Sequence, residues 1–303
     1  MVEQRLKYLS ENPFSQLPAL RLYKKIRAYI LALFIFLPVL VINIPQILTL
    51  LVKPFSQRSY RQINRYFADR YWAYLVYMVE TVNGIEVSFS GDKLPDDDNA
   101  LLLPNHQNIA DIPILLSLAK RKQRLGDMKW FMKSIIKFIP GPGFGMLFLD
   151  GIFLKRNWLD DESMIMRTFS KIHRFNVPIW LVAFLEGTRI TPEKLKASQA
   201  FAKSRGLTIP ERVMIPRTKG FVATIHGLKN HLDAVYDITI AYPQGIPSLW
   251  QMIMGDVKKV CVDVRRTPIS SLPDSDQGLE RWVMECFLEK EKRLNGFDKN
   301  GRF

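Results

Sequence analysis

The stretch Ala28–Val52 constrains the fold more than any other part of this sequence, because it contains no charged residue. A helix that crosses a bilayer needs roughly 20 apolar residues, so the stretch is long enough to do so. Pro38 and Pro45 interrupt it, and a proline inside a helix removes a backbone hydrogen bond. The pattern therefore predicts two short helices that form a hairpin, Leu22–Leu37 and Val39–Val52.

Basic residues flank the apolar stretch on both sides. Arg21, Lys24, Lys25 and Arg27 precede it, and Lys53, Arg58, Arg61 and Arg65 follow it. A single crossing normally has its lysines and arginines on one side, so two basic ends indicate that both face the cytoplasm. We therefore expect residues 1–57 to form a re-entrant or interfacial membrane hairpin and residues 58–303 to form the main domain. The alternative is a hairpin buried in a soluble core; a signal peptide is disfavoured, because mixed polar residues precede the stretch.

The charge balance of the 303 residues points to an anionic partner. There are 43 Lys and Arg against 29 Asp and Glu, a net charge of +14. Such an excess suits a bilayer, a phosphorylated small molecule or a nucleic acid. The sequence has no recognisable nucleic-acid-binding module, so we expect no nucleic acid partner. A hydrophobic fraction of 48% excludes a disordered chain, and only two cysteines, Cys261 and Cys286, exclude a disulfide-stapled scaffold.

The rest of the sequence predicts an α/β domain. Arg58–Val82 is a predicted helix whose many aromatic rings suit either a membrane surface or a packed core. The predicted strands are Glu86–Phe89, Ala100–Leu103, Lys129–Met132, Ile152–Leu154, Ile179–Phe184, Tyr236–Tyr242 and Val260–Val264. The other predicted helices are Ile112–Lys122, Asp160–Phe175, Thr191–Arg205, Lys219–Leu228 and Gln277–Leu294. This alternation is typical of a mixed β-sheet flanked by helices, here preceded by the membrane-associated helical hairpin.

A polar segment, Asn105–Asp111 (NHQNIAD), follows the predicted strand Ala100–Leu103. Open α/β sheets bind ligands beyond the carboxyl ends of their strands. A turn between this strand and the next helix could fold Asp111 back onto the imidazole of His106, which would orient a general base. The alternatives are that Asp111 is a plain helix cap and that His106 is a loop histidine without a role.

Three further segments place cations at strand ends or helix starts: Gly151–Arg156 (GIFLKR), Phe184–Arg189 (FLEGTR) and Ile215–Phe221 (IPRTKGF). The planar guanidinium of Arg189 suits phosphate oxygens, and a helix start also favours anions. The alternatives are ordinary charged strand ends and a solvated turn in which Arg189 pairs with Glu186.

In this order, NHQNIAD, GIFLKR, FLEGTR and IPRTKGF resemble the four motif blocks of the glycerolipid acyltransferases, the membrane enzymes related to 1-acylglycerol-3-phosphate acyltransferase. The resemblance covers residues 23–264 and leaves the C-terminal helix outside it. Two features look more like the branch with the longer lysophosphatidate and lysocardiolipin acyltransferases. One is Lys155 before Arg156, and the other is the run Arg217–Phe221 after Pro216.

The resemblance implies a role for each matched residue. His106 would be the general base that deprotonates the acceptor hydroxyl, and Asp111 would orient His106. Arg189 would be the phosphate ligand. The remaining matched residues would bind substrate: Asn105, Gly151, Phe153, Lys155, Arg156, Glu186, Gly187, Thr188, Pro216, Arg217 and Lys219.

The resemblance also implies the reaction. The acyl donor would be acyl-CoA or acyl carrier protein, the acceptor 1-acylglycerol-3-phosphate and the product phosphatidic acid, on the cytoplasmic side of a membrane (the inner membrane in a bacterium). The alternatives are another lysophospholipid acceptor, such as lysophosphatidylglycerol or lysocardiolipin, and a non-enzymatic basic lipid-binding protein. We expect no cofactor and no metal, because His173, His226 and His231 have no Cys or second His at ligand spacing. A serine hydrolase is disfavoured by the lack of a G-x-S-x-G elbow.

Overall fold

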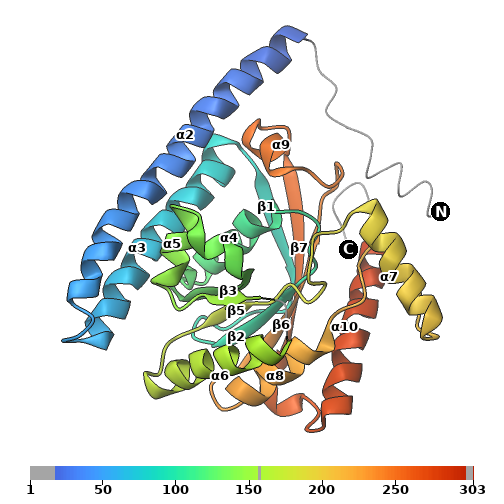
Figure 1. Cartoon of the computed structure of the whole chain (residues 1–303). Helices are drawn as coiled ribbons and strands as arrows, with labels where there is room; N and C mark the ends of the chain where they lie inside the picture. Colours follow the sequence, from blue (N-terminus) through green and yellow to red (C-terminus); the bar gives the residue numbers. More distant parts are fainter. Residues whose placement is uncertain (1–17, 156–157, 298–302) are drawn as a thin grey trace.

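The computed structural model describes residues 18–155, 158–297 and 303, which form a seven-stranded sheet with helices around it (Figure 1). The strands are β1 (Glu86–Gly91), β2 (Ala100–Pro104), β3 (Met128–Lys133), β4 (Ile152–Leu154), β5 (Trp180–Val182), β6 (Ala234–Ala241) and β7 (Lys259–Pro268). The α-helices are α2 (Pro18–Leu48), α3 (Gln57–Tyr77), α4 (Asp111–Arg121), α5 (Pro142–Leu147), α6 (Trp158–Arg174), α7 (Pro192–Ser204), α8 (Thr218–Leu228), α9 (Leu249–Ile253) and α10 (Asp276–Gly296).

The sheet has the strand order β1-β7-β6-β2-β5-β3-β4. Neighbouring strands are parallel, except that β6 and β7 are antiparallel. This confirms the predicted mixed sheet flanked by helices. Because β6, β2, β5, β3 and β4 run in one direction, their carboxyl ends lie along one edge of the sheet, and the segments that follow them gather there.

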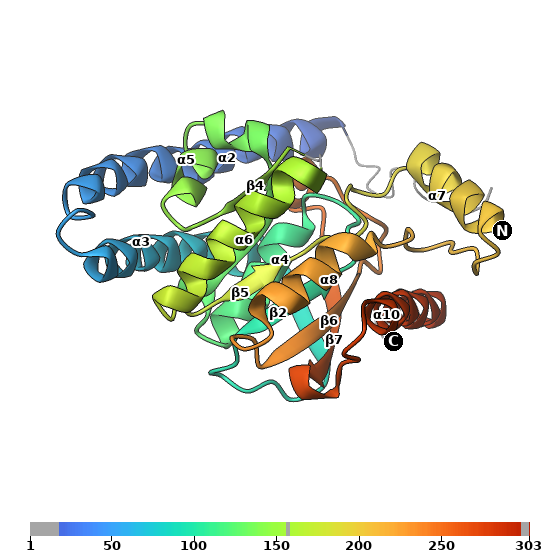
Figure 2. The ribbon, with the colours of Figure 1, turned by 60° about the horizontal axis from the view of Figure 1, so that its bottom comes forward.

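Two hydrophobic cores cover the two faces of the sheet. The side chains of β2 alternate between them: Leu102 lies in one core, and Leu101 and Leu103 lie in the other, as the two-residue period of a strand requires. The first core packs α3 and α4 against the sheet, and the second packs α6, α8 and α10 (Figure 2). A strand buried on both faces reads as a continuous apolar run, which explains the sequence Ala100–Leu103.

The predicted break at Pro38 is wrong. Most of the two short helices predicted for Leu22–Leu37 and Val39–Val52 is one continuous helix, α2, with Pro38 and Pro45 inside it. The hairpin predicted within Leu22–Val52 is therefore not formed; α2 packs instead against the following helix, α3, which lies beside it in both ribbon views (Figures 1 and 2). The division of the chain at residue 57 stays a prediction.

Two tyrosines of α3 explain how α2 continues through its first proline. Pro38 has no N–H, so the carbonyl of Phe34, four residues earlier, lacks its usual helical donor. The Tyr74 hydroxyl donates to that carbonyl at 3.0 Å, and the Tyr71 hydroxyl donates to the next carbonyl, that of Ile35, at 3.0 Å. Tyr74 therefore supplies the hydrogen bond that the proline removes, and Tyr71 adds a second bond to the same turn.

A polar residue of the apolar stretch connects α2 to another part of the fold. Asn43 is buried, donates to the Gln46 side chain at 2.9 Å and accepts from the backbone N–H of Gly141 at 2.9 Å. This contact fixes the segment after β3 against the middle of α2. Gly141 directly precedes the short helix α5, which begins at Pro142, a favoured residue at a helix start.

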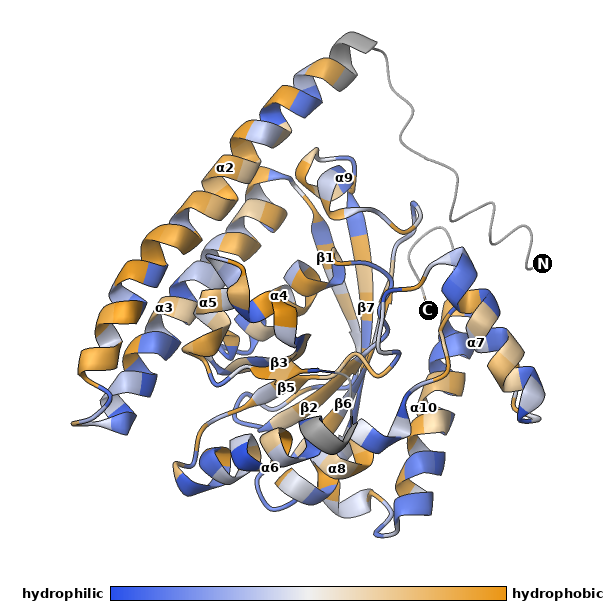
Figure 3. Cartoon of the chain, viewed as in Figure 1, coloured by the Kyte–Doolittle hydropathy of each residue, from blue (hydrophilic) through white to orange (hydrophobic). Residues whose placement is uncertain are grey.

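Many apolar side chains of α2 and of the segment that packs against it are exposed, and the ribbon of α2 is mostly orange in Figure 3. The set called here the apolar face comprises Ile30, Leu33, Phe34, Leu37, Val41, Ile44 and Leu48 on α2, with Ile135 and Phe138 from the 3₁₀ helix η4 (Ser134–Phe138), Ile139 after it, and Leu147 from α5. Within the described residues, Leu22–Leu51 is the one helical segment long and apolar enough to cross a membrane by length and composition. Only 17% of its most apolar window is buried, which argues against a soluble core helix.

Candidate active site

The candidate site lies at the edge formed by the carboxyl ends of the parallel strands. Asn105 begins it, directly after β2. Its buried amide donates to the Ile240 carbonyl at 3.0 Å, and the Ile240 N–H donates to the Asn105 side-chain oxygen at 2.7 Å. The side chain thus extends the ladder between β2 and β6 by one step. This contact fixes the point at which the backbone leaves the sheet and places His106 at the edge.

Asp111 contacts the imidazole of His106, with 3.0 Å between Asp111 Oδ2 and His106 Nδ1. The carboxylate is fully buried and accepts two more hydrogen bonds, from the Asn108 N–H at 2.9 Å and from the Tyr242 hydroxyl at 2.8 Å. Helix α4 begins at Asp111 and its N-cap, Ala110, makes no side-chain cap, so Asp111 is not a plain cap. A carboxylate only accepts, so a neutral imidazole in this contact would donate from Nδ1 and leave Nε2 as an acceptor.

The imidazole is held on its face as well. The Phe184 ring stacks on it with 3.8 Å between ring centroids and an interplanar angle of 23°, and Trp130 stacks beyond Phe184 at 6.3 Å. The His106 side chain is 14% exposed, and Nε2 has no hydrogen-bond partner among the described residues. One ring nitrogen and one ring face are therefore fixed, and the second nitrogen is available to a substrate.

Glu186 joins the first motif to the segment before α8. The backbone N–H of His106 donates to its Oε1 at 2.8 Å, and the backbone N–H of Met214 donates to its Oε2 at 3.2 Å. Burial raises the pKa of the Glu186 carboxyl to about 8, against the two backbone donors, which lower it. No ion pair joins Glu186 to Arg189 in the described part of the chain, so the alternative of a surface turn closed by that pair is wrong.

Cations surround the turn that follows Glu186. Gly187 has φ +70°, and a Cβ there would lie 2.7 Å from the Nε atom of Arg217, so the missing side chain leaves room for that guanidinium. The Lys194 ammonium donates to the Thr188 hydroxyl at 2.7 Å. Arg189 is exposed, and its guanidinium forms no ion pair within residues 18–155 and 158–297. The turn therefore offers positive charge to an anion.

The fourth motif completes this positive region. Pro216 is buried, and the Arg217 N–H donates to the Leu185 carbonyl at 2.8 Å, which ties the motif to the turn after β5. Lys219 is exposed in the first turn of α8. The N-terminus of a helix attracts anions through its unpaired N–H groups and its dipole.

The second motif lies farther away. It consists of β4 with Gly151 before it and Lys155 after it, and β4 is three strands from β2, a distance of ~14 Å at ~4.8 Å per strand. Phe153 is buried in a hydrophobic core, and a Cβ on Gly151 would lie 2.8 Å from Met146 O. Lys155 is exposed at the same edge of the sheet as His106. Arg156 lies outside the described residues.

Sequence reasoning missed three residues that contact the candidate site. Tyr242, Phe184 and Lys194 lie inside predicted elements, where they looked like ordinary strand and helix residues. For Tyr242 the signal is a polar aromatic residue at the carboxyl end of a predicted strand; that this strand neighbours β2 is seen only in the structure. Within the described residues, no group of His, Cys, Asp and Glu side chains is arranged to hold a metal ion.

Comparisons with known proteins agree with the resemblance. Residues 86–243 match the family model "Acyltransferase", and residues 251–303 match "Acyltransferase C-terminus". The C-terminal helix, which the motifs left outside the resemblance, is therefore part of the family pattern. A solved 1-acyl-sn-glycerophosphate acyltransferase from Thermotoga maritima has the same fold, with a TM-score of 0.55, 16% identity, and coverage of 90% of this chain and 95% of that one.

Curated relatives are more similar in sequence. 1-Acyl-sn-glycerol-3-phosphate acyltransferase 3 of Arabidopsis thaliana is 35% identical over 265 residues, covering 85% of this chain and 70% of that protein. Lysocardiolipin acyltransferase 1 of Mus musculus is 34% identical over 251 residues, covering 80% and 67%. These matches exclude the non-enzymatic lipid-binding protein that the charge alone left open. The chain is an acyltransferase, and it belongs to the family of the 1-acylglycerol-3-phosphate acyltransferases and their lysocardiolipin acyltransferase relatives.

Proposed function

We propose that the chain transfers a fatty acyl group from a thioester, acyl-CoA or acyl carrier protein, to the free hydroxyl of 1-acylglycerol-3-phosphate, giving phosphatidic acid. The observation that carries this proposal is the contact of 3.0 Å between His106 Nδ1 and the fully buried carboxylate of Asp111. That contact fixes the imidazole in the tautomer whose Nε2 accepts a proton. The names of the relatives support the acceptor.

The reaction follows from this geometry. His106 Nε2 takes the proton of the acceptor hydroxyl, and the hydroxyl oxygen attacks the carbonyl carbon of the thioester. The imidazolium that forms is stabilised by Asp111. The carbon–sulfur bond then breaks, and the leaving thiolate takes the proton from Nε2, which restores the neutral base.

The positive region beside His106 supports a phosphorylated acceptor. Arg189 has an exposed guanidinium, Arg217 lies over Gly187, and Lys219 lies in the first turn of α8. We assign the acceptor phosphate to Arg189 and this helix start, because a guanidinium can bind two phosphate oxygens at once.

The apolar face supports association with a membrane. An apolar side chain that leaves water gains about 25 cal/mol per Å² of area, and the face combines α2 with η4 and α5. Lys133 and Lys137 lie within two residues of the exposed Ile135, and Phe138 directly follows Lys137; cations beside exposed apolar residues suit anionic headgroups. We infer that the protein lies on the cytoplasmic side of its membrane, where the lysophospholipid reaches the site from the bilayer.

Another lysophospholipid is the second candidate acceptor. The similarity to lysocardiolipin acyltransferases supports it, and so does the exposed Lys155 at the far end of the same sheet edge, where a second phosphate would find a cation.

The test measures thiol release by purified protein, with acyl-CoA or acyl carrier protein as donor. Lysophosphatidate, lysophosphatidylglycerol and lysocardiolipin are supplied one at a time, and lysophosphatidate should give the highest kcat/KM. His106→Ala should lower kcat by ~10²–10⁴, the usual range for a lost general base. The matched control is His226→Ala, because His226 also contacts an aspartate, Asp276, at 2.6 Å, but lies exposed on α8. More than a tenth of the activity left in His106→Ala contradicts the proposal.

A further inference from the structure

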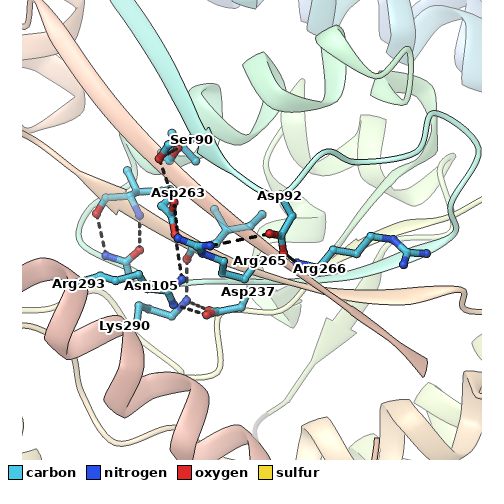
Figure 4. Close-up of polar contacts among 12 residues, drawn as sticks. Ser90, Asp92, Asn105, Asp237, Asp263, Arg265, Arg266, Lys290 and Arg293 are labelled. Carbon is cyan, nitrogen blue, oxygen red and sulfur yellow. Dashed lines mark hydrogen bonds and ion pairs between the residues drawn. The ribbon is translucent and has the colours of Figure 1, made fainter. Parts of the chain in front are cut away.

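A lysine of the C-terminal helix lies buried behind the candidate site. Lys290 of α10 has no exposed surface. Its ammonium donates to the Asp237 carboxylate, to the Ile238 carbonyl at 2.7 Å and to the Leu103 carbonyl at 3.1 Å (Figure 4). An ammonium has three donors, so all of its hydrogen bonds are made, and both strands that meet at the site supply acceptors.

Stability alone is a poor reason for such a residue. Taking an ammonium out of water costs several kcal/mol, and a well-packed apolar side chain of similar volume often serves as well or better. The neighbours of Lys290 on the same side of α10, Val283 and Phe287, are apolar core residues. Filling the core therefore does not explain why this position is a lysine.

The two backbone carbonyls show where Lys290 acts. Leu103 lies one residue before the end of β2, and Ile238 is the last residue of β6 that pairs with β2. At this point the ladder bond from the Asn105 N–H to the Ile238 carbonyl is long, at 3.3 Å. The ammonium therefore adds a link between β2 and β6 at the last backbone pair of their ladder, directly before Asn105.

The same two strands carry the parts of the candidate catalytic pair. His106 follows β2, and Tyr242, which donates to Asp111, follows β6. A change in the separation of the strand ends would therefore move the imidazole relative to the carboxylate that orients it.

We propose that Lys290 is a positioning residue for acyl transfer, which joins the ends of β2 and β6 and so aligns His106 with Asp111 and Tyr242. This inference rests on the proposed function of His106 as the base. It predicts that loss of Lys290 lowers kcat and leaves the KM for the acceptor nearly unchanged, since the cations assigned to the phosphate lie elsewhere.

Arg293 provides a matched control one turn along the same helix. It pairs with Asp237 and, at 3.0 Å, with Asp263, so it belongs to the same buried cluster (Figure 4). Its hydrogen bonds go to side chains of β6 and β7, and none within the described residues reaches β2. Arg293→Met should therefore cost stability much as Lys290→Met does, without moving the β2 end.

The experiment compares Lys290→Met and Arg293→Met for kcat, acceptor KM and Tm. Lys290→Met should lower kcat by ~30- to 100-fold, because misplacing a reacting group by about 1 Å can cost ~10²-fold. Arg293→Met should keep kcat near that of the wild type at a comparable loss of Tm. If Lys290→Met does not fold, each substitution is combined with Asp237→Asn, which removes the carboxylate that would be left buried without its cation. The two double variants are then compared in the same way.

A loss of kcat that follows the loss of Tm equally in both variants overturns the inference and makes Lys290 a structural residue. A rise in acceptor KM at unchanged kcat also overturns it. These outcomes are distinct from failure of the proposed function, which appears as high residual activity in His106→Ala whatever Lys290 does.

Discussion

Replacing Asp111 with asparagine removes a negative charge and leaves the shape of the side chain unchanged. The carboxylate accepts from His106, Asn108 and Tyr242. The Asn108 N–H can only donate, so the amide oxygen of the variant should occupy the position of Oδ2, which also keeps the proton on His106 Nδ1. The amide nitrogen then faces Tyr242, whose hydroxyl can accept instead. Asp111→Asn should therefore preserve the tautomer and remove the charge that stabilises the imidazolium.

The size of the effect follows from the electrostatics. Two unit charges about 4 Å apart interact by about 4 kcal/mol at an effective dielectric constant near 20. The imidazolium charge is only partly developed when the hydroxyl attacks, so half of that energy, about 2 kcal/mol, is a reasonable lower figure. Since about 1.4 kcal/mol corresponds to a factor of ten, kcat should fall by roughly 30- to 1000-fold.

The assay is thiol release at saturating lysophosphatidate, with Tm measured on the same preparation. Asp98→Asn is the control. Asp98 is also buried and accepts from a tyrosine, Tyr236 at 2.6 Å, and from Arg266 at 2.7 Å, but it precedes β2 at the opposite edge of the sheet. Asp98→Asn should lower Tm and leave kcat near the wild-type value. The reasoning is refuted if Asp111→Asn loses less than tenfold in kcat, or if Asp98→Asn loses as much.

Three further outcomes are expected. Arg189→Ala should raise the acceptor KM by roughly 10- to 150-fold, the equivalent of about 1.5–3 kcal/mol for a charge-assisted phosphate contact. Arg189→Lys should raise the acceptor KM less, because a lysine keeps the charge but not the planar fork. A change in donor KM alone would show that Arg189 binds the donor and not the acceptor. Burial raises the pKa of Glu186 to about 8, so the folded protein keeps this carboxyl protonated at pH values where the unfolded chain has lost the proton. The wild type should therefore lose stability between about pH 5 and about pH 8, and the Tm of Glu186→Gln should rise relative to the wild-type Tm over that range. A difference in Tm that does not change with pH would contradict this. Ile135→Ser with Phe138→Ser should weaken binding to anionic vesicles at least ~30-fold, whereas Phe201→Ser on α7, 48% exposed, should not; equal effects would refute the role of the apolar face.

Much of the fold could be predicted from the sequence, because most of its signals are local. The seven predicted strands exist, and their bounds move by only a few residues; Ile152–Leu154 does not move at all. The missed elements are short, such as η4 and α9. Each has five residues, too few to show the periodic spacing of apolar residues that predicts a helix. The error at Pro38 has another cause. Its missing hydrogen bond is replaced by Tyr74 and Tyr71 of a different helix, and no local pattern contains that information.

In the candidate site, too, the local contacts could be predicted and the long-range contacts could not. His106 and Asp111 lie within one short segment, so their contact could be anticipated from a turn between strand and helix. Tyr242, which fixes the far oxygen of Asp111, comes 131 positions later along the chain, and Lys290 contacts Leu103 across 187 positions. Contacts of this length depend on which strands become neighbours, and the alternation of strands and helices does not fix that order.

The strand order also explains why the C-terminal segment is inseparable from the site. β7, which lies in that segment, pairs with β6 on one side and with β1 on the other, so β1 joins the sheet only through β7. Helix α10 then returns from the end of β7 to the ends of β6 and β2, where Lys290 makes its contacts. The four motifs supply the groups proposed to react, while the segment after them supplies a strand of the sheet and a buried cation next to the base. Residues 251–303, which match a separate family model, are therefore packed into the same sheet as the motifs, and their removal would detach β1 and leave Asp237 without its lysine.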